Sequence, residues 1–193
     1  MNQKEKLLKI INQYGVMAQL EYYQTEVREL NQAIDVHELK KSVEYEIPLT
    51  EIIGTKEHIA EEIIDNCVML YQFPLYYYEK LDEHNIAPYE FKTDNYEHID
   101  DIDKYLKGFT KSIFKLNRAV IIAEEREQDY ISEYLYEEVT YAVDEVIYKL
   151  LSIKEYYHIS TKDLKEIGEY KINRQIERIE NEKVWWNRIV KKI

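Results

Sequence analysis

The sequence predicts an all-α protein that folds as a bundle of amphipathic helices. Helix breakers are rare, because only 4 glycines and 3 prolines occur in 193 residues. The chain is rich in Glu, Lys, Leu and Ile, and its apolar residues recur at spacings of three and four. Hydrophobic residues make up 45% of the chain, enough for a sizeable core. We therefore expect a single all-α domain over residues 1–193.

The first half of the chain is expected to form three helices. The first covers residues 4–14 and the second covers 16–36. One apolar stripe follows the second helix and consists of Leu20, Tyr23, Val27, Leu30 and Ile34. After a less regular stretch at 44–54, the third helix covers 56–77. Proline lacks an N–H and disturbs the preceding turn, so Pro74 is expected to kink or fray the end of this helix.

The second half is expected to form three longer helices after a connector at 85–95. These helices cover 102–128, 130–156 and 161–191. Ser160 or Thr161 is a suitable N-cap for the last one, and Asp163 follows in its first turn. The whole chain is thus expected to consist of helices, with its longer connections at 44–54 and 85–95.

The chain also resembles itself. Three segments of the first half, in order, resemble segments of the second: 27–34 with 113–120, 60–70 with 140–150, and 85–92 with 158–165. This pattern predicts two tandem helical hairpins packed on each other, a first repeat at about 8–95 and a second, degenerate repeat at about 101–193. The alternative is coincidence among amphipathic helices of similar composition.

Charge and missing motifs exclude several classes of protein. A formal net charge of −12 argues against nucleic-acid binding and against an anionic membrane surface, while a nucleotide accompanied by divalent metal stays possible. Cys67 is the only cysteine, so no internal disulfide can form. The sequence contains no GxGxxG, GxxxxGK[ST], HExxH or GxSxG motif. No apolar run approaches the roughly 20 residues that span a bilayer, and we expect a cytoplasmic protein.

Two pairs of acids stand out on consecutive predicted helices. Glu26 and Glu29 form an ExxE pair, and Glu62 and Asp65 form an ExxD pair with Glu61 beside it. Residues at i and i+3 share a helix face, so two facing helices would gather four carboxylates beside apolar stripes. Buried carboxylates need a partner, and Mg²⁺ is the simplest one, with Mn²⁺ next. The alternative is that each pair lies on a solvated helix face.

These segments resemble a known superfamily. EVRELNQAI at 26–34, followed by HIAEEIIDNCVMLYQF at 58–73, is similar to the ExxE…ExxD signature of the MazG-like, all-α NTP pyrophosphohydrolases, which include the dimeric dUTPases. The tail GEYKINRQIERIENEK at 168–183 resembles the closing helix of phage and Firmicute MazG-like proteins. The resemblance implies MazG-like helical hairpins that pair into a four-helix core. It implies Mg²⁺ held by Glu26, Glu29, Glu62 and Asp65, and cleavage of a nucleoside triphosphate to the monophosphate and pyrophosphate.

The second repeat has lost this set of acids. In the internal alignment Glu26 corresponds to Ser112, Glu29 to Lys115 and Glu62 to Ala142, and only Asp65 retains an acid, as Glu145. One active site per chain is therefore expected, with the second repeat as scaffold and lid. The duplication makes either an intramolecular pseudo-dimer or a homodimer possible.

Roles can be assigned to the remaining charged residues of the first repeat and the tail. Glu61 or one of the four metal ligands, Glu62 among them, is the candidate for orienting the attacking water. Lys56, Lys171 and Arg174 are the candidates for contacting the substrate phosphates, although Lys171 and Arg174 also fit an ordinary solvated face of a charged helix. The rival hypothesis is a non-catalytic helical module that binds nucleotides or proteins. The base and the sugar of a substrate are not encoded in any recognisable motif.

Overall fold

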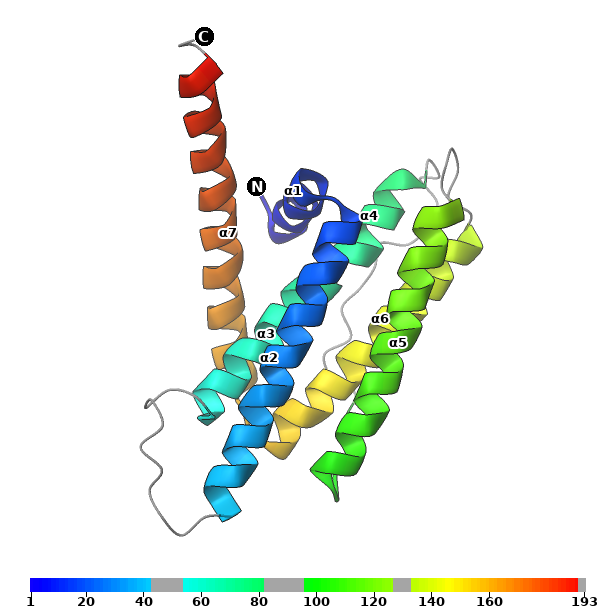
Figure 1. Cartoon of the computed structure of the whole chain (residues 1–193), viewed down its shortest axis with the longest axis vertical. Helices are drawn as coiled ribbons and strands as arrows, with labels where there is room; N and C mark the ends of the chain where they lie inside the picture. The colour runs from blue at the N-terminus through cyan, green and yellow to red at the C-terminus, as the bar shows by residue number, and fades with distance from the viewer. Residues whose placement is uncertain (43–53, 82–95, 127–132, 191–193) are drawn as a thin grey trace.

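The computed structural model describes residues 1–42, 54–81, 96–126 and 133–190, with side chains up to residue 182. Its elements are α1 (Gln3–Tyr14), α2 (Val16–Ser42), α3 (Lys56–Leu70), α4 (Gln72–Lys80), α5 (Ile102–Arg126), α6 (Glu133–Tyr156) and α7 (Thr161–Val190) (Figure 1). The all-α prediction is confirmed. The predicted connector at 85–95 and most of the irregular stretch at 44–54 lie outside the described residues.

The first turn begins at a clear capping signal. Asn2 and Glu5 form a capping box, in which the Asn2 side chain accepts from the Glu5 N–H at 2.9 Å and the Glu5 carboxylate accepts from the Asn2 N–H at 2.8 Å. Gly15 follows α1 with φ of 86°, a left-handed value that glycine adopts without strain. The chain therefore turns at Gly15 and enters α2 at once.

Two antiparallel helix pairs form the body of the molecule. We call α2 with α3 the first hairpin and α5 with α6 the second hairpin. Figure 1 shows α2 running antiparallel to α5, with α3 and α6 also side by side and antiparallel. A continuous core joins both hairpins and includes Tyr23, Ile63, Phe109 and Val143, all fully buried. Burial of this apolar surface is the main stabilising contribution.

The third predicted helix is broken, which corrects the expectation of one helix over 56–77. α3 ends at Leu70, and α4 starts at Gln72 after a turn at Tyr71. Pro74 explains the position of the break: it cannot donate the hydrogen bond to the carbonyl of Leu70, and its ring crowds that carbonyl. The disturbance therefore lies one turn before Pro74. α2 also extends to Ser42, beyond the predicted end at residue 36.

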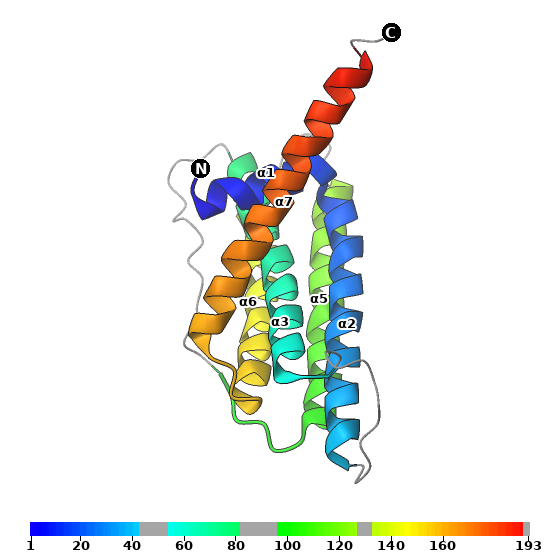
Figure 2. The ribbon, with the colours of Figure 1, turned by 90° about the vertical axis from the view of Figure 1, so that its left-hand side faces the viewer.

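α7 lies outside the body and packs against α1 and α3 (Figure 2). Its apolar residues Ile172, Ile176 and Ile179 join Leu7 and Ile10 of α1 in two small clusters separate from the main core. α7 thus closes the outer side of the first hairpin. None of the described helices is both long and apolar enough to cross a membrane.

Candidate functional site

Three carboxylates meet where α2 faces α3. Glu26, Glu62 and Asp65 each offer an oxygen that lies within 4.8 Å of the others, and we call this group the acidic cluster. Glu62 and Asp65 share a face because they are three residues apart on α3, and the packing of α2 brings Glu26 opposite them. Oxygen donors in this arrangement are the ligands that hard divalent cations take in proteins. The acidic cluster is therefore a group that could hold a metal ion.

The electrostatics of the acidic cluster show an excess of negative charge. Burial, followed by the neighbouring Asp65, raises the pKa of both Glu26 and Glu62 to about 7. Burial also raises the pKa of Asp65, although Lys171 opposes that rise. A divalent cation would offset both the burial and the repulsion that raise these pKa values.

Only one of the two carboxylate oxygens of Glu62 has a partner among the described residues. Glu62 is 7% exposed, and its Oε1 lies 3.2 Å from Nε2 of His58, whereas its buried Oε2 has no hydrogen-bond partner among the described residues. The N–H of Gly54 donates to Nδ1 of His58 at 3.3 Å, so the neutral ring carries its proton on Nε2 and donates it to Glu62. His58 thus orients the carboxylate and leaves its second oxygen for a ligand in the acidic cluster.

Asn66 fixes the two helices at the height of the cluster. It is fully buried, and its Nδ2 donates to the backbone carbonyls of Glu62 at 2.8 Å and of Glu26 at 3.0 Å. One amide group therefore links α2 to α3 at the two residues that carry cluster carboxylates. The separation of these carboxylates is set by that link, since each helix is rigid over one turn.

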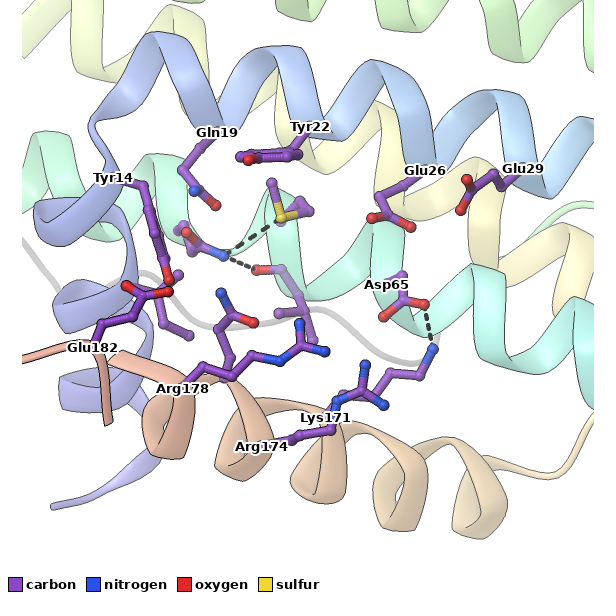
Figure 3. Close-up of a pocket in the computed structure, with 15 residues that line it drawn as sticks. Tyr14, Gln19, Tyr22, Glu26, Glu29, Asp65, Lys171, Arg174, Arg178 and Glu182 are labelled. Atoms are coloured by element: carbon purple, nitrogen blue, oxygen red, sulfur yellow. Dashed lines mark hydrogen bonds and ion pairs between the residues drawn. The ribbon is translucent and has the colours of Figure 1, made fainter. Parts of the chain in front are cut away.

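α7 presents positive charge to the acids. Lys171, Arg174 and Arg178 follow one face of α7 and line the same cavity as Glu26 and Asp65, and we call them the α7 cationic stripe (Figure 3). Lys171 forms an ion pair with Asp65, and its ammonium nitrogen also lies 3.9 Å from Oε2 of Glu61. The stripe thus contacts the cluster through Lys171, while Arg174 and Arg178 line the cavity beside it. Cations and acids around one cavity are the arrangement expected of a site for a polyanion held with metal.

The cavity between α7 and the first hairpin has a volume of about 690 Å³. Acids and cations line one part of it. The remaining lining comes from α1, α2, α3, α4 and α7, and consists of Ile10, Tyr14, Gln19, Tyr22, Val68, Met69, Gln72, Gln175 and Glu182. This volume lies within the range of about 300–1,000 Å³ found for small-molecule sites.

The structure places the other predicted site residues around this cavity or away from it. Glu29 lines the cavity but is not one of the three carboxylates within 4.8 Å of one another. Glu61 lies beside Lys171, with its carboxylate half exposed. Lys56 is exposed at the first position of α3 and is not among the residues that line the cavity.

Sequence reasoning missed His58, Asn66 and Arg178. His58 stands four residues before Glu62, and Arg178 stands four after Arg174, so helical spacing alone carried a usable signal for both. Asn66 carried a weaker one, a polar residue on the apolar face of α3. Their roles depend on which helix lies opposite, and spacing within one helix does not contain that information.

The second hairpin has a different arrangement at the residues aligned with the cluster. Glu145 accepts a hydrogen bond from the Ser112 hydroxyl at 2.7 Å and forms an ion pair with Lys115 at 2.9 Å. The side chain of Ala142 has neither a donor nor an acceptor. Burial tends to raise the pKa of Glu145, but the hydrogen bonds from Lys115 and Ser112 outweigh it and lower that pKa. This acid is neutralised by its own hairpin.

Comparison of the chain with protein-family models, curated proteins and solved structures finds no match.

Proposed function

We propose that this protein is a Mg²⁺-dependent nucleoside triphosphate pyrophosphohydrolase, which cleaves an NTP or dNTP to the monophosphate and pyrophosphate. The observation that carries the proposal is that Glu26 and Asp65 of the acidic cluster line the same cavity as the α7 cationic stripe, with Glu62 buried behind them. Carboxylates alone favour a cation and a basic stripe alone favours an anion. Together around one cavity, they favour a phosphate chain bound together with a divalent ion.

The residues divide into three tasks. Glu26, Glu62 and Asp65 would hold the ion, and Glu29, three residues along α2 on the same cavity wall, would bind a second ion or a water of the first. The bound ion supplies charge neutralisation at the phosphate oxygens and lowers the pKa of a coordinated water. Arg174 and Arg178 bind the phosphate oxygens, and Lys171 exchanges its partner Asp65 for a phosphate.

Glu61 is the best candidate for positioning the attacking water. Its carboxylate lies beside Lys171, next to the acidic cluster but outside the set of three oxygens that would surround the ion. A carboxylate in that position can accept a proton from the water without competing for the metal. Mn²⁺ would serve in place of Mg²⁺, because both take oxygen ligands.

We also infer that the two hairpins are tandem copies and that only the first is active. Their antiparallel pairing is what two copies related by a twofold axis would give, and it makes the chain an intramolecular pseudo-dimer (Figure 1). Lys115 neutralises Glu145 in the second hairpin, so that hairpin has no need of a diffusible cation.

A panel of NTPs and dNTPs with Mg²⁺ tests the activity. Pyrophosphate and orthophosphate are assayed separately, because release of pyrophosphate identifies cleavage between the α and β phosphates. Glu62→Gln should lower the rate by about a hundredfold. The matched control is Glu145→Gln, which changes an acid of the second hairpin and should leave the rate unaltered. Nucleotide binding without turnover of any substrate would instead identify a non-catalytic binding module.

A further inference from the structure

The cavity extends beyond the acids and cations, toward α1. Gln19, Tyr22, Glu26 and Glu29 lie on one stripe of α2, and all four line the cavity. With a rise of about 1.5 Å per residue, Gln19 lies about 10 Å along α2 from Glu26. A ligand whose phosphates lie at Glu26 would therefore place its other end beside Gln19 and Tyr22.

This end of the cavity differs chemically from the end at the acidic cluster. Gln19 is 3% exposed and Tyr22 is 57% exposed, so a buried amide lies next to an accessible aromatic ring. Figure 3 shows both on the α2 wall, with Arg178 on α7 across from them. Met69 adds a polarisable thioether to the lining. An amide, an aromatic ring and a thioether suit a flat heteroaromatic ligand with a hydrogen-bonding edge.

A second observation points to a ligand with N–H donors. Gln72 lines the cavity and is fully buried, and its Nε2 donates to the carbonyl of Val68 at 3.0 Å. That bond fixes the amide, since a flip would set two oxygens against each other. Its Oε1 is left without a donor among the described residues. A buried acceptor without a donor costs about 1–3 kcal/mol, which a ligand N–H would offset after a small shift of the side chain.

We propose that this part of the cavity is a nucleobase subsite, in which Tyr22 stacks on the base and Gln19 and Gln72 bind its edge. The proposal rests on the proposed function only for the placement of the phosphates. It adds that the substrate is recognised as a nucleotide, and not as a bare polyphosphate chain.

Calorimetric titration with Mg²⁺ present tests the subsite on the whole chain. The ligands are α,β-methylene analogues of ATP, GTP, CTP and UTP, which resist the proposed cleavage, and inorganic tripolyphosphate, which has no base. At least one analogue should bind about tenfold more tightly than tripolyphosphate, because one stacked base contributes that much. Tyr22→Ala and Gln19→Met should remove most of this difference and leave the affinity for tripolyphosphate unchanged.

Two control variants separate this subsite from general effects. Tyr141→Ala removes another exposed tyrosine, on α6 and outside the residues that line the cavity, and should change neither affinity. Arg174→Ala should weaken both ligands together. The subsite would be overturned if tripolyphosphate and every analogue bound equally tightly, or if neither kind of ligand bound. It would also be overturned if Tyr22→Ala weakened the binding of the analogues and of tripolyphosphate by the same factor. Base-dependent binding without turnover would keep the subsite and reject the hydrolase, whereas turnover with base-independent binding would do the reverse.

Discussion

The ammonium group of Lys115 lies 2.9 and 3.0 Å from the two carboxylate oxygens of Glu145, so a cation of α5 donates to both oxygens of an acid of α6. In the first hairpin the acid aligned with Glu145 is Asp65, and it is paired with Lys171 of α7, which is 106 residues away in sequence. In the sequence alignment of the two hairpins, Asp65 and Glu145 occupy the same position, and each is paired with a lysine. The lysine of the second hairpin is its own Lys115, whereas that of the first hairpin comes from α7. The outside cation can exchange for another without unfolding the hairpin.

Metal-free protein should lose stability as pH rises from about 4.5 to about 7. Burial and the neighbouring carboxylates raise the pKa values of Glu26 and Glu62 to about 7 in the folded state, from an ordinary value of 4.5. The folded state therefore binds more protons than the unfolded state in this window, and stability falls as they dissociate. Thermal unfolding in EDTA should show a smaller fall for Glu62→Gln than for wild type. The Glu145→Gln control should not reduce the fall, because the pKa of Glu145 is lowered. Identical profiles for Glu62→Gln and wild type would contradict the prediction.

Replacing Lys171 by Met should tighten binding of the bare metal ion and weaken catalysis. Lys171 competes with a cation for Asp65, so its removal should raise the affinity for Mn²⁺ several-fold without nucleotide. The same change removes a phosphate contact, so turnover should fall. Mn²⁺ affinity can be measured by electron paramagnetic resonance. Lys115→Met is the matched control and should leave the Mn²⁺ affinity unchanged. Weaker Mn²⁺ binding in Lys171→Met than in wild type would show that this lysine does not compete with the ion.

Asn66→Ala should destabilise the protein by about 1–3 kcal/mol, because it removes both side-chain hydrogen bonds that Asn66 donates to the carbonyls of Glu26 and Glu62. Urea unfolding measures this change. Asn173→Ala is the control, since Asn173 is exposed and accepts a surface hydrogen bond from Lys6, and it should change stability by less than about 0.5 kcal/mol. If both variants unfold at the same urea concentration as wild type, the link between α2 and α3 is not needed.

Gly54→Ala should destabilise the protein by about 1–3 kcal/mol. Gly54 has φ of 76°, and an added Cβ would lie 2.6 Å from Cγ1 of Val36 and 3.0 Å from the backbone nitrogen of His37. The variant should also weaken metal binding, because the N–H of Gly54 orients His58. Gly108→Ala in α5 should have the opposite sign and raise the melting temperature, since its added Cβ meets only the end of Lys149. A neutral Gly54→Ala would show that the turn adapts.

Helical periodicity was sufficient for the architecture but not for the break at Tyr71. The apolar stripe of α2 and the pairing of ExxE and ExxD faces follow from spacing within single helices. The start of α4 depends on how far a proline disturbs the turn before it, and Pro74 could equally have frayed a helix end. Local sequence alone does not decide between these outcomes.

The candidate site was predictable to the extent that its residues lie on neighbouring helices. Glu26, Glu62 and Asp65 follow from the spacing of acids on two consecutive segments. The neutralising role of Lys171 does not, because it is 106 residues from Asp65 in sequence and depends on where α7 docks. The same holds for Gln72, whose buried amide is in the sequence only a polar residue two positions before Pro74.

The chain has two hairpins but a single α7, and that helix covers only the outer side of the first. Lys115, at the aligned place on the second hairpin, is 64% exposed to solvent. Acids retained there would have faced open water, where hydration competes strongly with any ion. A permanent, covalently attached counter-ion suits that open face, and it lets the second hairpin stay folded whether or not a divalent metal is present.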